Sequence, residues 1–290
     1  MLRYLALPFF LLIAACSQVS RTAPPQPEPS PIAPRVAAAP VPQVTAPAVA
    51  APPAPVVPPV STQSHLGLAY HQSSSNGVTL SMVSFDNRSH QLRVADQQNG
   101  LGSRWNTAQE AAATYGGLAA INGGFFTPEG KPLGLLVETG SRRGHLNRSS
   151  LGAGVFVSNK SQAAIIRRET YQKTAGSWNA YNLLQTGPML AENFRRISGL
   201  SKKSSRPRSF IAWDGKNHWA IGYTSECTLA QLAKALAGKS PAGFKIETAV
   251  NLDGGRSSDL WVGNQVSGGG KTHRGFLNKP VRNYLVLITR

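Results

Sequence analysis

The stretch that decides the fold is Ala249-Val250-Asn251-Leu252-Asp253-Gly254-Gly255, and a similar one is Ala120-Ile121-Asn122-Gly123-Gly124. Each begins as a short apolar strand and ends in Asn and a Gly-Gly pair. Because glycine allows a backbone to approach a ligand closely, the paired turns predict two strand ends that meet at one shared cleft. Two unrelated tight turns are the alternative interpretation.

A short helix is predicted before each of these strands. Residues 107–110 and 228–231 read Thr-Ala-Gln-Glu and Thr-Leu-Ala-Gln, the capping-box pattern that opens a helix. Gly116 and Gly238 then suit the left-handed position that ends a helix. Helix, strand, Asn and Gly-Gly therefore occur twice in the same order.

Short strands account for most of the remaining pattern. The segments 78–83 and 91–94 flank a polar turn at 86–88, and 209–213 and 218–223 flank an Asp-Gly turn that suits a hairpin. A third hairpin is predicted from 155–157 and 163–166, and the apolar run 284–288 predicts a buried strand. The sequence thus predicts a single α+β domain with a mixed or antiparallel sheet and a few helices packed on it.

The N-terminus has the pattern of an export signal. Residues 1–15 carry one positive charge followed by an apolar run too short to span a bilayer comfortably. The run closes with Ile13-Ala14-Ala15-Cys16, which resembles the lipobox of bacterial lipoproteins and predicts lipidation of Cys16. An ordinary secretory signal is the alternative. The Pro- and Ala-rich residues 16–64 predict an extended tether, which leaves residues 65–290 as the folded domain.

Charge and cysteine content bound the class of protein. The chain has 30 Lys+Arg against 13 Asp+Glu, a formal net charge of +17, which favours an anionic partner in the cell envelope. Loose adhesion to phosphate-rich lipids or polymers is the alternative. No aromatic-basic motif indicates nucleic-acid binding. Once Cys16 is lipidated, Cys227 has no second cysteine to pair with, so the fold depends on its core.

Four blocks, in order, resemble the motifs of the phosphodiester glycosidase family across essentially the whole domain: 122–126 (NGGFF), 185–190 (QTGPML), 208–211 (RSFI) and 251–258 (NLDGGRSS). The resemblance implies an enzyme that hydrolyses sugar phosphodiesters. Arg256 and Ala212 stand where relatives often have glycine, so the family's substrate does not transfer with the motifs.

Asp253 is the best candidate for the catalytic carboxylate. A side chain at a strand end within a Gly-Gly turn can project into a cleft and act as nucleophile or general base. A turn aspartate bonded to its own backbone is the alternative. Phosphate leaves readily, so a strong general acid is not required, and Glu129 and Glu138 are the nearest second carboxylates.

Arg208 is the predicted phosphate clamp, because a guanidinium makes paired charge-assisted hydrogen bonds and the following strand would fix its position. A solvated basic loop with Lys202, Lys203 and Arg206 is the alternative. Phe125 or Phe126 is expected to face a sugar ring or to pack in the core. His145 and His273 have no partner at metal-ligand spacing, so neither a metal nor another cofactor is predicted. The predicted substrate-binding residues are Asn122, Gly123, Gly124, Phe125, Gln185, Gly187, Asn251, Gly254, Gly255, Arg256 and Ser257.

The sequence therefore predicts a lipid-anchored protein of the bacterial cell envelope, on the periplasmic side of a membrane or at the outer membrane. Its domain is expected to hydrolyse glycosyl phosphodiesters of an envelope or extracellular glycan. A lipoprotein module that binds anionic envelope polymers without turnover is the alternative.

The lipid anchor can be tested with Cys16→Ser. The variant should lose the lipid mass and move from the membrane to the soluble fraction, because no other segment reaches membrane-spanning length. Fractionation and mass spectrometry of the mature protein measure both effects. Unchanged mass and membrane retention would refute the prediction.

Overall fold

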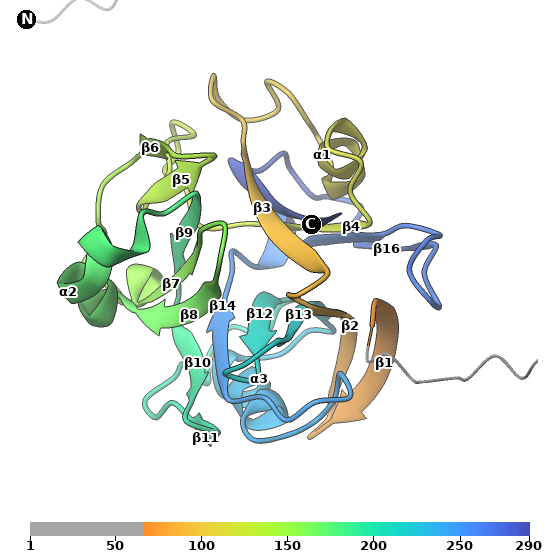
Figure 1. Cartoon of the computed structure of the whole chain (residues 1–290). Helices are drawn as coiled ribbons and strands as arrows, with labels where there is room; N and C mark the ends of the chain where they lie inside the picture. The colour runs from red at the N-terminus through yellow and green to blue at the C-terminus, as the bar shows by residue number, and fades with distance from the viewer. Residues whose placement is uncertain (1–66) are drawn as a thin grey trace, which may run out of the picture. The chain divides into compact units, whose positions relative to one another are not determined.

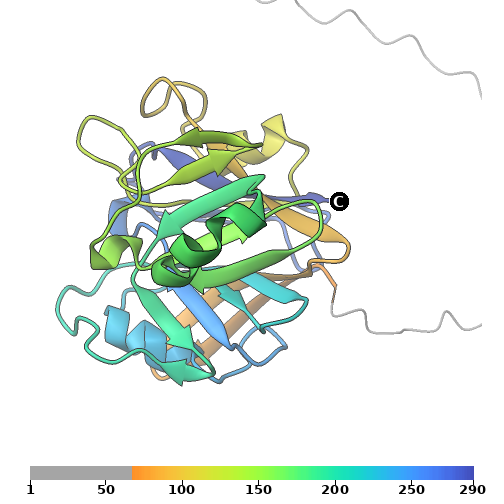
Figure 2. The same ribbon diagram turned by 60° about the vertical axis from the view of Figure 1, so that its left-hand side comes forward.

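The computed structural model describes residues 67–290, which form three antiparallel β-sheets and three α-helices (Figures 1 and 2). Every ladder between named strands is antiparallel, so the predicted α+β class is confirmed. No helix within residues 67–290 is long and apolar enough to cross a membrane. The predicted signal segment, Cys16 and the tether lie outside the described residues.

The first sheet contains both strands of the Asp-Gly hairpin. Trp213 lies opposite Trp219 at the turn, which confirms this hairpin. The seven strands of this first sheet, in spatial order, are β1 (Ala69–Ser75), β2 (Val78–Asp86), β13 (His218–Thr224), β12 (Ser209–Trp213), β14 (Thr248–Asn251), β10 (Met189–Glu192) and β11 (Arg195–Arg196).

The other two sheets have five strands each. The second contains β16 (Lys271–Arg274), β15 (Asp259–Val262), β4 (Ala119–Asn122), β17 (Asn283–Thr289) and β3 (His90–Asp96). The third contains β6 (Ser141–Arg143), β5 (Leu136–Glu138), β9 (Asn182–Thr186), β7 (Gly154–Ser158) and β8 (Ala163–Arg167). The predicted hairpin of β7 with β8 is confirmed, as is the buried C-terminal strand β17.

The predicted pairing of β2 with β3 is wrong. The polar turn is present, and Asp86 accepts a 2.8 Å hydrogen bond from the Arg88 N–H and pairs with its guanidinium. However, β2 is already paired on both edges, with β1 and β13, while β3 pairs with β17 in the second sheet. The turn therefore carries the chain from one sheet to another rather than back along the same sheet.

All three sheets direct one face into a common apolar core. Strands β2, β4, β7 and β17 contribute Val83, Ile121, Phe156 and Leu285 to it, each 1 % exposed or less. The opposite faces are covered by α3 (Leu229–Leu236) on the first sheet, α1 (Ala108–Thr114) on the second and α2 (Arg168–Trp178) on the third. Figure 1 shows these helices outside their sheets. Strands buried on both faces appear in the sequence as continuous apolar runs, as in β17.

The helix ends follow the predicted caps. Thr228 and Gln231 form a reciprocal capping box at α3, and the Thr107 side chain accepts the Glu110 N–H at α1. Gly116 and Gly238 have φ of 60° and 64°. The helix α2 was not predicted, because no side chain caps its first turn and its sequence is polar on average.

Candidate active site at the junction of two sheets

The structure brings the two Gly-Gly turns together. Although β4 and β14 belong to different sheets, the Asp253 N–H donates to the Gly123 carbonyl at 3.0 Å, and the Asn122 amide donates to the Asp253 carbonyl at 2.8 Å. Two backbone turns are thus joined directly, as the repeated motif predicts.

All four N–H groups of the two Gly-Gly pairs donate to acceptors within the protein. Gly123 and Gly124 donate to the backbone and side-chain oxygens of Asn283, both at 2.8 Å. Gly254 donates to Asp253 Oδ1 and Gly255 to the Pro207 carbonyl, also at 2.8 Å. A Cβ on Gly123 would lie 1.9 Å from Asn283 Oδ1. The first pair therefore serves close packing between chain segments.

Asn122 is fully buried and fully engaged. Its Oδ1 accepts from the Ser209 hydroxyl at 2.6 Å and from the Asp259 N–H at 3.0 Å, while Nδ2 donates to Asp253. These partners begin β12, begin β15 and follow β14. The side chain joins strands of two sheets, which is the role of a buried amide in satisfying backbone and hydroxyl groups.

Gln185 has the same kind of role. Its Oε1 accepts the N–H groups of Leu135 and Asn147, and its Nε2 donates to the carbonyls of Asn147 and Gly152, at 2.7–3.0 Å. All four of its hydrogen-bonding positions are used by the protein, so Gln185 serves as a buried tie between chain segments in this structure.

Gly187, which follows β9, and Asn251, at the end of β14, are joined by a hydrogen bond. A Cβ on Gly187 would lie 2.3 Å from the Ser150 carbonyl oxygen, so the position requires glycine. Asn251 Nδ2 donates to the Gly187 carbonyl at 3.0 Å and to the Leu252 carbonyl at 2.5 Å. The buried Asn251 Oδ1 has no hydrogen-bond partner among the described residues. Gly187 is thus a packing residue, and Asn251 keeps one free acceptor.

Asp253 differs from the amides because its carboxylate is held by few groups. Its Oδ1 accepts the Gly254 N–H, and the Ser257 side chain hydrogen-bonds to the carboxylate. Burial raises the pKa of Asp253, an effect that these two hydrogen bonds and the nearby Arg206 charge partly offset. The side chain is only partly buried, so it combines a perturbed pKa with access from outside.

Arg208 lies beside this turn, 7 % exposed and directly before β12. Its Nε donates to the Cys227 carbonyl at 3.1 Å and its Nη2 to the Ser204 carbonyl at 2.7 Å. A Cβ on Gly254 would lie 3.4 Å from Arg208 Cδ and 3.7 Å from Nη1. Two of the three nitrogens therefore hold the protein backbone, and Nη1 is the one next to the Asp253 turn.

Arg206 also adjoins the Asp253 turn, although the sequence predicted it only as part of a solvated basic loop. It is exposed, and its guanidinium is held by the Ser204 hydroxyl. A Cβ on Gly255 would lie 3.3 Å from Arg206 Cδ, and the Arg206 charge lowers the pKa of Asp253. The signal for Arg206 in the sequence is the tripeptide Arg206-Pro207-Arg208, in which one arginine stands on each side of the proline.

The other predicted residues lie further from the carboxylate. Arg256 is exposed, and its Nε donates to the Leu277 carbonyl at 2.9 Å on the loop before β17. Phe125 is partly buried and pairs through its carbonyl with the Leu133 N–H, while Phe126 packs against the α1 cluster. Arg256 thus turns toward a neighbouring loop, and Phe126 packs in the core.

Neither alternative carboxylate adjoins the Asp253 turn. Glu129 is exposed and hydrogen-bonds to Thr127, and Glu138 is buried in a separate network with Tyr115. Asp259 does adjoin the junction, yet its Oδ2 accepts from the Ala108 N–H at 2.9 Å and pairs with Arg274 at 2.7 Å. No signal in the sequence distinguished Asp259 as a partner of α1.

Metal-ligand clusters and reactive cysteines are two other kinds of site that the described residues can be compared with. Within this range no group of three or more His, Cys, Asp or Glu lies together as metal ligands. Cys227 is buried and free there, and burial raises the pKa of its thiol. The candidate site is therefore a carboxylate in a turn that adjoins the side chains of Arg206 and Arg208, at the junction of two sheets.

A protein-family model matches more than half of this sequence. The phosphodiester glycosidase model covers residues 115–288, and the chain belongs to this family. No curated protein matches the sequence significantly.

Solved structures share the fold at low sequence identity. The catalytic domain of zebrafish N-acetylglucosamine-1-phosphodiester alpha-N-acetylglucosaminidase, auto-inhibited by pro-peptide, has 15% identity and a TM-score of 0.54, over 77% of this chain and 83% of that one. A hypothetical protein from Synechocystis has 17% identity and a TM-score of 0.54, over 81% and 64%. A putative exported protein from Burkholderia pseudomallei has 13% identity and a TM-score of 0.52, over 73% and 74%.

The structural role of Asn122 predicts the effect of Asn122→Ala. The change leaves the Asp253 carbonyl, the Ser209 hydroxyl and the Asp259 N–H without their partner, at ~1–3 kcal/mol for each buried group left unpaired. Urea unfolding should show a loss of several kcal/mol. A loss below about 0.5 kcal/mol would contradict the role, and Asn99→Ala at an exposed bend is the control.

Arg208→Lys tests whether this guanidinium also supports the backbone. An ammonium cannot reach the carbonyls of Cys227 and Ser204 together, so the free energy of unfolding should fall by about 1.5–3 kcal/mol. The matched change Arg206→Lys, at an exposed site, should stay within about 0.5 kcal/mol. Equal stabilities of the two variants would show that Arg208 is not a structural tie.

Proposed function

We propose that this domain hydrolyses glycosyl phosphodiesters, with Asp253 as the reactive carboxylate and Arg206 and Arg208 as the phosphate-binding groups. One observation carries the proposal: a partly buried carboxylate with a raised pKa lies in a turn whose two glycines adjoin the side chains of Arg208 and Arg206. The family membership and the name of the zebrafish protein with this fold support the bond type. The sugar is not part of the proposal.

The chemistry divides between the two kinds of group. Cleavage of a sugar–O–phosphate bond develops positive charge at the anomeric carbon and negative charge on the leaving phosphate. A carboxylate stabilises the positive charge at the anomeric carbon or attacks that carbon. The attack is direct, or it occurs through a water from which the carboxylate takes a proton. Guanidiniums stabilise the negative charge on the phosphate through charge-assisted hydrogen bonds. Since phosphate is a good leaving group, this assignment needs no separate general acid.

The proposed setting is the bacterial cell envelope. Export and lipidation at Cys16 rest on the sequence, and the net charge of +17 favours an anionic glycan or sugar-phosphate substrate. We propose an envelope or extracellular glycan as the source of the substrate. A module that binds such polymers without turnover is the competing proposal, and turnover separates the two.

Asp253→Asn tests the reactive carboxylate. Because Asn keeps the size of the side chain but not its charge, kcat on a glycosyl 1-phosphodiester should fall by about 10²–10⁴-fold, as measured by sugar release. The control is Asp214→Asn, which changes a turn aspartate bonded to the N–H groups of Lys216 and His218. That control should lose stability and keep its activity. Parent-like turnover by Asp253→Asn would remove Asp253 from the reaction.

The raised pKa of Asp253 gives the same test a pH dependence. A base must be ionised, so kcat/KM should rise with pH through an inflection above the usual aspartate value of 3.8. The folded protein holds the Asp253 proton to a higher pH than the unfolded chain does. The free energy of unfolding therefore falls as the pH rises through the pKa that Asp253 has in the folded state. Above that pH, Asp253→Asn should unfold at the same or a higher denaturant concentration than the parent. A lower midpoint would indicate a structural aspartate.

A further inference from the structure

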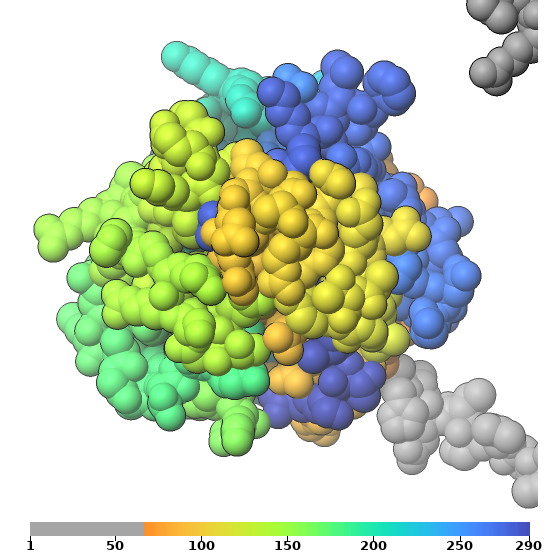
Figure 3. Space-filling view, turned by 90° about the horizontal axis from the view of Figure 1, so that it is seen from above, coloured from red at the N-terminus to blue at the C-terminus, as the bar shows by residue number. Residues whose placement is uncertain are grey.

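A basic pocket whose lining includes no residue of the Asp253 turn lies between the segment that joins β3 to α1 and the β5–β6 hairpin. Figure 3 looks onto the face where these segments, orange to yellow and green, adjoin. The pocket has a volume of about 220 Å³ and is lined by Arg93, Gln98, Arg104, Tyr115, Glu138, Thr139, Ser141 and Arg143. This volume is below the ~300–1,000 Å³ of sites for drug-sized ligands, so it suits a single sugar-sized group.

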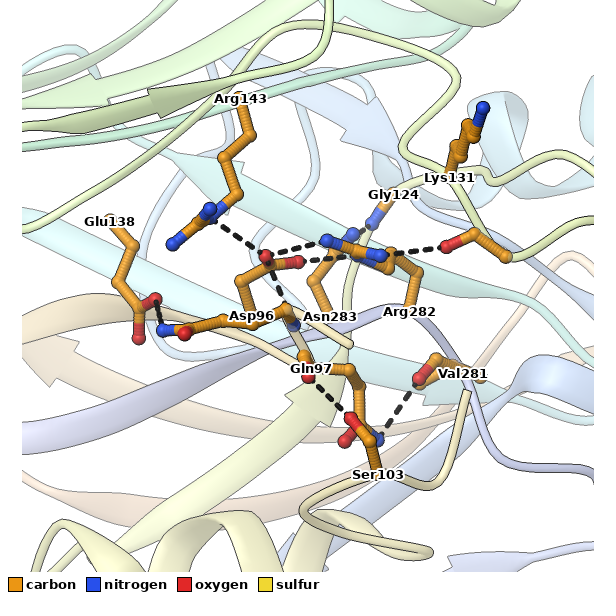
Figure 4. A network of polar contacts seen from close by, with 12 residues as sticks. Asp96, Gln97, Ser103, Gly124, Lys131, Glu138, Arg143, Val281, Arg282 and Asn283 are labelled. Carbon is orange, nitrogen blue, oxygen red and sulfur yellow. Dashed lines mark hydrogen bonds and ion pairs between the residues drawn. The ribbon is translucent and has the colours of Figure 1, made fainter. Parts of the chain in front are cut away.

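The network beneath the pocket fixes two of its arginines. Asp96 is fully buried and receives a bidentate pair from Arg282 at 2.7 and 2.8 Å, and Arg143 Nε lies 3.1 Å from the same carboxylate (Figure 4). Arg104 donates to the Asp96 carbonyl at 3.1 Å, and its guanidinium stacks on the Trp105 ring at 4.1 Å. These side chains are therefore positioned before any ligand arrives, which lowers the entropic cost of binding.

Arg93 is the group that points to a ligand. Its guanidinium stacks over the Tyr115 ring at 4.2 Å, and it makes no hydrogen bond or ion pair with any described residue. Its Nε is buried without a partner, an arrangement that costs free energy and is uncommon in folded proteins. A half-buried cation without an anion next to a pocket is thus a position where an anion would be stabilised.

The local charge supports the same conclusion. Four guanidiniums, those of Arg93, Arg104, Arg143 and Arg282, meet two carboxylates, those of Asp96 and Glu138, which leaves two positive charges uncompensated.

The second carboxylate lies on the wall of the pocket. Glu138 accepts from the Tyr115 hydroxyl at 3.1 Å and from the Gln98 amide at 3.4 Å, and Arg104 is 3.9 Å away. A ligand that carries both an oxyanion and hydroxyl groups would match arginines beside an acceptor carboxylate.

We infer that this pocket is a second, non-catalytic site for an acidic sugar unit, whose carboxylate or phosphate oxyanion contacts Arg93 and Arg143 and whose hydroxyls contact Glu138. The inference does not depend on turnover at Asp253. It gives the protein a place to hold an anionic group of a glycan apart from the bond that is cleaved.

Calorimetric titration of the folded domain, residues 65–290, with glucuronate, glucose 6-phosphate and neutral glucose tests the site. At least one of the two anions should bind, more weakly as salt rises, while glucose should not bind detectably. The two anions distinguish a carboxylate from a phosphate ligand. Binding of neither anion, or equal binding of glucose, would overturn the inference.

Variants locate the binding. Arg93→Met, which keeps an apolar stem against Tyr115, should weaken anion binding at least tenfold. Arg142→Gln, the neighbour of Arg143 on the other face of β6, removes the same charge and should leave the affinity within about twofold. Arg206→Gln at the Asp253 turn should likewise leave it unchanged. Loss of binding in Arg206→Gln but not in Arg93→Met would assign the anion to the candidate active site and overturn the inference.

A second variant guards against misfolding. If Arg93→Met unfolds at a lower temperature than the parent, Arg143→Gln replaces it, because that side chain is 36% exposed and Arg282 still pairs with Asp96. Its affinity should fall at least tenfold as well. Parent-like affinity in a folded Arg143→Gln protein would contradict the site.

Discussion

The hydrogen bonds of the Asn122 amide are the constraint on which the candidate site depends. This one side chain binds the Ser209 hydroxyl, the Asp259 N–H and the Asp253 carbonyl, so it connects the starts of β12 and β15 with the turn after β14. With the Asp253 N–H bound to Gly123 as well, the backbone of Asp253 is held on both sides. The carboxylate is held in turn by the Gly254 N–H and the Ser257 side chain, so the rigid scaffold places the reactive group.

The buried carboxylates of the domain differ in how they are neutralised. Asp96 and Asp259 each have an arginine at 2.7 Å, so both carboxylates are engaged in structural ion pairs. Asp253 instead accepts from a backbone N–H and the Ser257 side chain, and burial raises its pKa as it raises that of Asp259. Because Asp253 has no ion pair with a described residue, its oxygens are freer than those of Asp259 to contact a substrate or a water, which favours Asp253 over Asp259 for chemistry.

Local signals predicted local structure well. The caps at Thr228 and Thr107, the hairpin at Asp214-Gly215 and the doubly buried strand β17 all depend on neighbours in sequence, and all are present. The pairing of β2 was predicted wrongly because a turn specifies a change of direction, whereas the choice of partner depends on which sheet edges are free. Tertiary packing decided that choice.

The same distinction explains the candidate site. Motif order predicts Asp253 and Arg208 as site candidates, whereas Asn122 and Gln185 are buried ties whose partners come from distant segments. Whether an amide faces a ligand or a backbone carbonyl depends on those partners, and a single sequence does not show them.

The net charge acquires a more specific meaning once the arginines are placed. Arg282 and Arg274 are paired with buried carboxylates, so their charge is used within the fold. Arg206 and Arg93 form no ion pair among the described residues, and each adjoins a candidate anion position.

The excess of basic residues acts over long range, raises the rate of encounter with a polyanion and is screened by salt. The unpaired guanidiniums act at contact distance, where orientation and hydrogen-bond geometry decide which anion is held. Composition alone therefore indicates an anionic partner, whereas selectivity for a particular anion has to come from those few side chains.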